Sequence, residues 1–209
     1  EGKLAAITKE LLGCGHKLAE ALGEDLCAVL VGSDMRAAAN EAIAFGATKT
    51  YVVDHHLLGE YQPDGYLLSM VKVLKEVMPK VLIMGQTSVG RDLMPRLAFS
   101  LDTIAVLDCI DLSIDKESGQ LLRTKPVYGG KALATYAGDS YPQMATVRIK
   151  SQTPAEKDES RSGEIIPIEP EFTETSIRTK LCEKVLEEKK GIKLEDAEVI
   201  ISGGRGIGG

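Results

Sequence analysis

Short, mostly apolar runs alternate with helical patterns through the first half of this chain, and this alternation restricts the fold more than any other feature. Residues 26–31 (LCAVLV), 80–84 (KVLIM) and 103–107 (TIAVL) have the length of strands, and 50–53 (TYVV) is a shorter one. They lack the polar–apolar alternation of a strand with one solvated face, so both faces are expected to be buried. The pattern predicts an α/β fold with an open, mostly parallel, Rossmann-like sheet.

Helical periodicity fills the intervals between these runs. Apolar residues recur at helical spacing over 4–22, 35–45, 64–78 and 91–101. We expect Gly23 to end the first helix and Ser33 or Asp34 to cap the second. Pro95 is expected in the first turns of the fourth helix, where proline is tolerated. Strand–helix alternation predicts right-handed crossovers with helices on both faces of the sheet.

The first recognisable element is a helix, whereas a doubly wound unit usually starts with a strand. We therefore expect a strand that is not part of this sequence to precede it.

After residue 108 the pattern changes. Four segments alternate like antiparallel strands, separated by turn signals such as Ser118-Gly119 and Gly129-Gly130: 111–114, 121–125, 132–136 and 144–149. They predict a β-rich antiparallel extension of the parallel sheet. Residues 151–163 are polar and indicate a loop, 164–168 a short strand, and 180–190 a charged helix.

The end of the sequence carries a candidate ligand site. Residues 196–202 (DAEVIIS) predict a strand that runs into the glycine-rich turn 203–209 (GGRGIGG). Clustered glycines after a buried strand present backbone N–H groups to a phosphate, and Arg205 adds a fixed cation. We expect an α/β domain over 1–178, a hinge helix or linker over 179–195, and the start of a second domain over 196–209.

A second candidate site is the turn from Gly85 to Asp92, between the 80–84 strand and the helix that follows it. Thr87 and Ser88 can donate hydrogen bonds to an anion, glycines such as Gly90 allow its close approach, and Arg91 can neutralise it. The alternative is purely structural: Thr87 or Ser88 caps the helix and Arg91 pairs with a neighbouring acid. The Gly129-Gly130 pair beside Tyr128 is interpreted as a hairpin connection.

Composition excludes several classes of function. The net charge of −6 and the absence of tryptophan disfavour nucleic-acid binding. No apolar run reaches the roughly 20 residues of a membrane-spanning helix. The four cysteines form no CxxC pair and His55-His56 has no further ligand nearby, so no metal site is expected. Free thiols fit a reducing compartment such as the cytoplasm.

Three segments together resemble the alpha subunit of electron transfer flavoproteins. They are 85–101 (GQTSVGRDLMPRLAFSL), 124–148 (TKPVYGGKALAT…PQMATVR) and 199–209 (VIISGGRGIGG). Their order and spacing make the resemblance specific, and it covers essentially the whole chain. Lys125 and Lys131 depart from the arginine and asparagine usual in the family.

This resemblance implies an N-terminal α/β domain, with a fold like that of adenine nucleotide alpha hydrolases, followed by an FAD-binding domain. It implies that Ser202, Gly203, Gly204, Arg205 and Gly206 contact the FAD pyrophosphate. It implies pairing with an electron transfer flavoprotein beta subunit and exchange of electrons with flavin dehydrogenases, such as an acyl-CoA dehydrogenase, without catalysis by the subunit itself. Some members bifurcate electrons. The implied location is the cytoplasm, or the mitochondrial matrix in a eukaryote.

One alternative belongs to a different class of function. The same fold serves adenine-nucleotide-binding domains, in sensors or enzymes that bind ATP or AMP. Such a protein would use the turn from Gly85 to Arg91, which contains Thr87 and Gly90, as its phosphate site.

Overall fold

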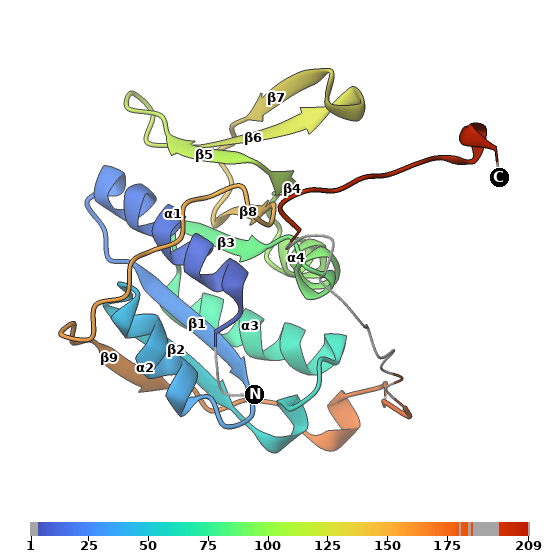
Figure 1. Cartoon of the computed structure of the whole chain (residues 1–209). Helices are drawn as coiled ribbons and strands as arrows, with labels where there is room; N and C mark the ends of the chain where they lie inside the picture. The colour runs from blue at the N-terminus through green and yellow to red at the C-terminus, as the bar shows by residue number, and fades with distance from the viewer. Residues whose placement is uncertain (1–3, 180, 184, 186–196, 209) are drawn as a thin grey trace.

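The computed structural model describes residues 4–179, 181–183, 185 and 197–208. Its body is an α/β unit with two parallel sheets and a third, antiparallel sheet at one end (Figure 1). The prediction of an α/β, Rossmann-like fold with a β-rich extension is confirmed, although the parallel strands form two sheets rather than one.

The first parallel sheet has the order β1 (Cys27–Gly32), β2 (Lys49–Asp54), β9 (Glu164–Pro167). The strands are in register through Val29, Tyr51 and Ile166, which lie side by side. β9 follows the irregular segment after residue 150, so the chain returns to the first sheet only after it has completed the other two.

The second parallel sheet has the order β3 (Val81–Gly85), β8 (Gln143–Val147), β4 (Ala105–Cys109). The prediction that 144–149 belongs to the antiparallel extension is wrong. All five residues of β8 are buried, and the strand runs parallel between β3 and β4. Burial on both faces, rather than alternation, is the mark of such a central strand.

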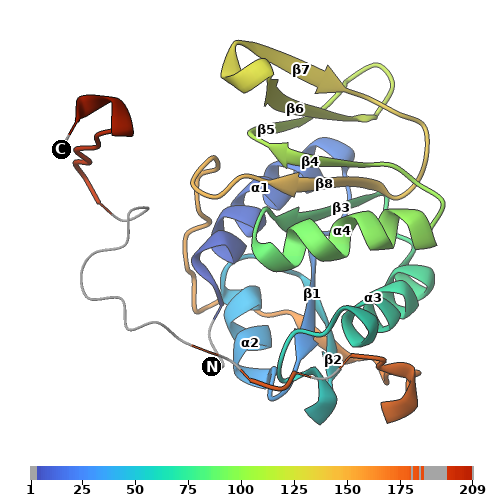
Figure 2. The same ribbon diagram turned by 90° about the vertical axis from the view of Figure 1, so that its right-hand side faces the viewer.

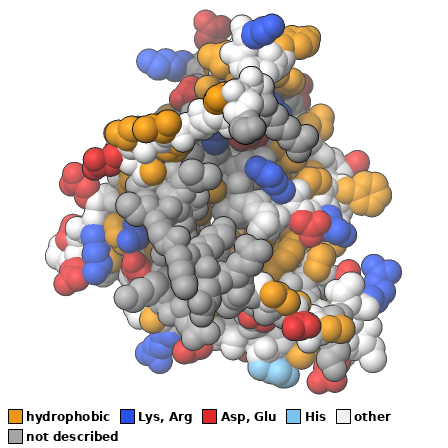
Figure 3. All heavy atoms as spheres, turned by 45° about the vertical axis from the view of Figure 1, so that its right-hand side comes forward, with side chains coloured by type: hydrophobic (Ala, Val, Ile, Leu, Met, Phe, Trp, Pro, Cys, Tyr) orange, Lys and Arg blue, Asp and Glu red, His pale blue; other side chains and the backbone are white. Residues whose placement is uncertain are grey.

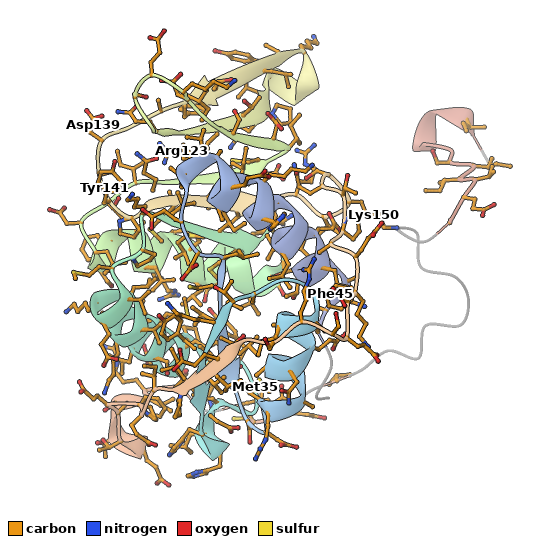
Figure 4. The ribbon with its side chains drawn as sticks, turned by 90° about the vertical axis from the view of Figure 1, so that its left-hand side faces the viewer. Met35, Phe45, Arg123, Asp139, Tyr141 and Lys150 are labelled. Atoms are coloured by element: carbon orange, nitrogen blue, oxygen red, sulfur yellow. The ribbon has the colours of Figure 1, made fainter. Side chains whose placement is uncertain are left out.

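The antiparallel sheet consists of β5 (Asp111–Ile114), β6 (Leu121–Val127) and β7 (Ala132–Tyr136), as predicted. A short 3₁₀ turn, η2 (Tyr128–Gly130), connects β6 to β7, with Gly129 and Gly130 at positive φ. Arg123 of β6, which Figure 4 labels, is 2% exposed, and burial lowers the pKa of its guanidinium.

Helices cover the parallel strands on both faces (Figure 2). α1 (Ala6–Leu22) and α2 (Arg36–Ala44) pack together on one face through Leu12, Ala42 and Phe45, the last of which is labelled in Figure 4. α3 (Pro63–Val77) and α4 (Ser88–Ser100) form the other face with an apolar core around Met144. Among the described residues, no helix is long and apolar enough to cross a bilayer.

Two helix starts differ from the predictions. Neither Ser33 nor Asp34 caps α2: Met35 is its N-cap residue and makes no capping bond through its side chain. The Asp54 carboxylate, at the end of β2, accepts hydrogen bonds from the N–H groups of Asp34 and Met35 instead, both at 2.9 Å. α4 begins at Ser88, so Pro95 lies inside the helix rather than in its first turns, and Arg91 loses the N–H donor that would normally meet its carbonyl.

The end of α1 and the C-terminal segment compare differently with the predictions. Gly23 terminates α1 in the left-handed conformation, as expected. Residues 197–202 are not a strand, because they pair with no other strand that the structure describes. Residues 197–208 extend away from the α/β body and contain the 3₁₀ turn η5 (Arg205–Ile207) (Figures 1 and 2). The predicted helix over 180–190 lies largely outside the described residues.

Candidate functional site

Three parallel strands end at one edge of the second sheet, and the candidate site is built there. β3, β8 and β4 run in the same direction, so Gly85, Val147 and Cys109 lie at the same carboxyl edge. The N-terminus of α4 follows β3 directly at this edge. Ligands of open α/β sheets bind outside the carboxyl ends of the strands, where loops and helix N-termini meet.

The turn from β3 into α4 is held by internal contacts. The Thr87 hydroxyl accepts a hydrogen bond from the Gly90 N–H at 3.1 Å, so Thr87 caps the helix. A Cβ on Gly90 would lie 1.9 Å from the Gly85 carbonyl oxygen, so only glycine fits there. Both Thr87 and Gly90 are therefore explained by the structure of the turn itself, as the structural alternative predicts for Thr87. Arg91 is exposed at the same turn.

An ion pair joins the ends of β4 and β8 beside this turn. Arg148 donates two hydrogen bonds to the Asp108 carboxylate, from Nε to Oδ1 at 2.9 Å and from Nη2 to Oδ2 at 2.7 Å. The hydrogen bonds from Arg148 are the main cause of the lowered pKa of Asp108. Burial acts in the opposite direction, and the charges of Lys125 and Arg91 lower the pKa further. The positive charges of Arg148, Lys125 and Arg91 thus all act on this one carboxylate, and they outnumber it.

Hydrogen bonds fix the strand ends that carry this pair. The Asp108 N–H donates to the Thr146 hydroxyl at 2.9 Å, and the Thr146 hydroxyl donates to the side-chain carbonyl of Gln86. The Gln86 N–H donates to the Val147 carbonyl at 2.8 Å, and the Arg148 N–H donates to the Cys109 carbonyl at the same distance. These hydrogen bonds hold the ends of β3, β8 and β4 together beside Asp108 and Arg148.

The second predicted set of ligand residues lies in the extended segment 197–208. Ser202, Gly203, Gly204 and Gly206 are exposed, and Arg205 begins η5. A Cβ on Gly204 or Gly206 would meet nothing within 4 Å, so the backbone at both positions is open to a close approach. The phosphate contact that the glycine-rich turn predicts, and the pyrophosphate contact that the family resemblance implies, stay predictions.

The structure places the two predicted sets apart. Thr87, Gly90 and Arg91 lie together at the N-terminus of α4, whereas residues 197–208 lie away from the α/β body (Figure 1). Sequence reasoning gave no role to Gln86, which lies within the predicted Gly85–Asp92 turn, and it missed Asp108, Thr146 and Arg148 as site residues. The polar residues directly after two apolar runs, 105–107 and 144–147, were the available signal, but the wrong prediction for β8 hid their common edge.

Fold and site together define a Rossmann-like α/β domain with an antiparallel extension and a cationic carboxyl edge. The family model for the electron transfer flavoprotein domain matches residues 1–172. The chain belongs to the electron transfer flavoprotein family.

Curated relatives match the whole length of the chain. It is 42% identical over 209 residues to the electron transfer flavoprotein subunit alpha of Thermoanaerobacterium thermosaccharolyticum, covering all of this chain and 63% of that protein. It is 38% identical to the subunit alpha of Megasphaera elsdenii, covering 99% of this chain and 62% of that protein. It is 33% identical to the acryloyl-CoA reductase electron transfer subunit beta of Anaerotignum propionicum, covering 99% of this chain and 63% of that protein. The chain thus spans less than two thirds of the length of these relatives.

Proposed function

We propose that this chain is part of an electron transfer flavoprotein alpha subunit that carries electrons between flavin dehydrogenases and a downstream acceptor. The observation that carries the proposal is the similarity to proteins named as such subunits, which covers 99–100% of this chain. In this role the protein is an electron carrier without a reaction of its own. Its site of action is the cytoplasm.

The proposed cofactor is FAD, held at its pyrophosphate by Ser202, Gly203, Gly204, Arg205 and Gly206. The exposed, unobstructed backbone at Gly204 and Gly206 supports this assignment. When bound, a flavin accepts electrons from one protein and gives them to another. The chain contributes backbone N–H groups and the cation of Arg205, which hold the anionic part of the cofactor. In this proposal 1–178 is an α/β domain, 179–195 connects it to the next domain, and 196–209 begins the FAD-binding domain.

The proposed role of the carboxyl edge is to face an anionic group of the cofactor or of a partner protein. Arg91 is exposed, and the Arg148 side chain is 45% exposed although it is paired with Asp108. Because the Asp108 charge is shared among several cations, positive potential remains at this edge. Thr87 and Gly90 act here by fixing the start of α4.

The proposed partner is a beta subunit that binds the antiparallel extension. Tyr128 is 83% exposed and Leu133 is 63% exposed, although large apolar side chains of this kind are usually buried. At the top of Figure 3, over the β5–β7 sheet, hydrophobic side chains lie beside basic ones. Exposed aromatic and apolar side chains next to charges are typical of protein interfaces. The flavin dehydrogenase is proposed to be one that acts on acyl-CoA, as the name of one relative indicates for that relative.

The test is to co-express the full-length polypeptide with its beta subunit and to purify the complex. The expected result is a heterodimer with stoichiometric bound flavin that an acyl-CoA dehydrogenase and its substrate reduce. A complex without flavin would contradict the proposal, and so would a flavin that the dehydrogenase does not reduce. Calorimetry with ATP and AMP tests the alternative function, because micromolar binding to the 209-residue chain would favour an adenine-nucleotide-binding domain.

A further inference from the structure

One arginine lies in the interior without a partner of opposite charge. Arg123 of β6 is 2% exposed, and its Nε is buried with no hydrogen-bond acceptor among the described residues. Within that part of the chain, the Cys109 thiol is the one titratable group that acts on the pKa of Arg123, and no carboxylate does. A guanidinium stays charged in proteins, and a buried charge is strongly unfavourable unless it is paired. This arginine therefore needs an anionic partner.

The side chain of Arg123 lies between the antiparallel sheet and the second parallel sheet (Figure 4). Residues two apart on a strand share a face, so Arg123 lies on the face of β6 that also carries Leu121. Leu121 belongs to the same buried cluster as Val147 and Cys109, at the ends of β8 and β4. A Cβ on Gly138 would lie 3.3 Å from the Arg123 Nη2, so the guanidinium reaches the connection between β7 and β8.

Two acids on the adjoining segments already have partners. Asp108 accepts both hydrogen bonds of Arg148, at 2.9 and 2.7 Å. Asp139, in the connection between β7 and β8, is exposed, and its carboxylate accepts a hydrogen bond from the side-chain amide of Gln120. Neither carboxylate is a cause of the pKa shift of Arg123. The residues that the structure describes thus leave the charge of Arg123 uncompensated.

A second cation shares this face of β6. Lys125 lies two residues further along the strand and is half-buried. The charges of Lys125 and Arg123 both lower the pKa of Cys109, so both cations lie near this thiol. Two residues along a strand span about 7 Å, and both long side chains can reach one small anion across this distance. The thiol itself is not that anion, because burial raises the pKa of Cys109 to about 11.

We propose that Arg123 and Lys125 bind a small oxoanion, of the phosphate or carboxylate type, between the antiparallel sheet and the end of β4. The Nε and Nη2 groups of Arg123 form a fork of two parallel donors, and such a fork matches a pair of oxygens. Arg148 uses the same two nitrogens to hold Asp108 in this protein. Lys125 adds a third donor and a second positive charge. The low exposure of Arg123 restricts the ligand to a small molecule.

The test titrates the 209-residue chain with inorganic phosphate, and separately with acetate, at pH 7. Sodium HEPES keeps the ionic strength constant, because its anion is too bulky for a buried site. The NMR signal of the Arg123 Nε–H group is followed together with Tm. We expect this signal to shift saturably, and Tm to rise by roughly 3 °C or more at saturation. A signal that moves with neither anion would overturn the proposal.

Three variants separate this site from phosphate binding elsewhere on the surface. Arg123→Met replaces a buried charge by an apolar side chain of similar length, which folded proteins tolerate, and it should lose the rise in Tm. Lys125→Met should weaken the apparent affinity by roughly tenfold. Lys116→Met, in the exposed β5–β6 turn, is the matched control and should respond like the parent chain. An equal rise in Arg123→Met would mean an adventitious ion only and would overturn the proposal.

Chloride tests the class of anion, and the parent chain decides the result if Arg123→Met does not fold. Chloride has no pair of oxygens for the fork, so it should act at least about tenfold more weakly than phosphate. Equal potency of chloride would overturn the assignment of an oxoanion. The Arg123 Nε–H signal of the parent chain and the response of Lys125→Met do not depend on the Arg123 variant. Neither flavin nor a beta subunit takes part, so the outcome is independent of the proposed electron-transfer function.

Discussion

Arg148 and Asp108 form a two-point ion pair across the ends of neighbouring strands, with donor–acceptor distances of 2.9 and 2.7 Å. The planar guanidinium matches the carboxylate in this arrangement, and lysine at position 148 could not reproduce both bonds. The pair fixes the position of the Arg148 guanidinium at the carboxyl edge, because Arg148 follows β8 directly and Asp108 lies near the end of β4.

The substitution Asp108→Asn is expected to lower the free energy of unfolding at pH 7 by about 0.5–1 kcal/mol, since both side chains are partly exposed. The pKa of Asp108 is lower in the folded state than in the unfolded state. Its stabilising contribution is therefore present above the unfolded pKa of about 4 and is lost as pH falls through the folded pKa. Urea unfolding at pH 7 and pH 2.5 is the measurement.

The difference in the free energy of unfolding between Asp108→Asn and the parent chain should accordingly be smaller at pH 2.5 than at pH 7. Glu117→Gln is the matched control, because Glu117 is exposed in the β5–β6 turn. A control that changes as much as Asp108→Asn, or a difference that grows in acid, would contradict the role given to the ion pair.

The substitution Gly90→Ala is expected to destabilise the fold by about 2–4 kcal/mol. The added Cβ would lie 1.9 Å from the Gly85 carbonyl oxygen, so β3 and α4 would have to move apart. Gly59→Ala is the control, because φ is −63° there and the nearest atom to a Cβ is 3.5 Å away. Denaturant unfolding of the two variants tests this. The free energy of unfolding of the control should change by less than about 0.5 kcal/mol. Comparable midpoints would show that the close contact at Gly90 carries no strain.

The buried thiols are expected to be inert in the native protein. Burial raises the pKa of both Cys14 and Cys109 to about 11, so at pH 8 roughly one molecule in a thousand carries either thiolate. Cys182 is exposed. Reaction with a thiol reagent at pH 8, followed by peptide mapping, should label Cys182 first, and denaturant should be needed to label Cys14 and Cys109. Rapid native labelling of either buried residue would mean that its surroundings open readily.

The sequence predicted most of the fold because its strands and helices have clear local signals. Continuous apolar runs identified β1 and β3, and glycine at position 23 identified the end of α1. β8 was assigned to the wrong sheet because its place depends on a long return of the chain from β7, which no local pattern records. The contacts before α2 were missed for a similar reason: the Asp54 carboxylate, which accepts hydrogen bonds from the Asp34 and Met35 N–H groups, lies 20 residues from Asp34.

The candidate site was predicted only in part. The turn with Thr87, Gly90 and Arg91 was found because a strand, a glycine and a helix follow one another in sequence. The pair of Asp108 and Arg148 is separated by 40 residues, and it comes together only because β8 lies beside β4. Charge clusters made by sheet order are not accessible to reasoning from spacing alone.

The interface proposed on the antiparallel extension predicts an effect of Lys131→Glu. Lys131 is exposed next to Tyr128, so reversing its charge would place an unfavourable charge at the contact. Affinity of the full-length polypeptide for its beta subunit is expected to fall by roughly tenfold, about 1.4 kcal/mol. Lys116→Glu, at the β5–β6 turn of the same sheet, is the control and should bind normally. Surface plasmon resonance at constant salt measures both, and equal affinities would remove the extension from the interface.

The cofactor assignment predicts the effect of Arg205→Gln in the full-length complex. A hydrogen bond from a charged donor to an anion contributes about 1.5–3 kcal/mol, so the FAD dissociation constant is expected to rise by roughly 10- to 100-fold. Arg161→Gln makes the same chemical change at an exposed residue whose partner is Asp158, at 3.6 Å, and should leave flavin affinity unchanged. Flavin fluorescence titration of the apo-complexes gives the constants, and circular dichroism checks that both variants fold. Wild-type affinity in a folded Arg205→Gln complex would place the pyrophosphate elsewhere, because no other cation lies within residues 197–209.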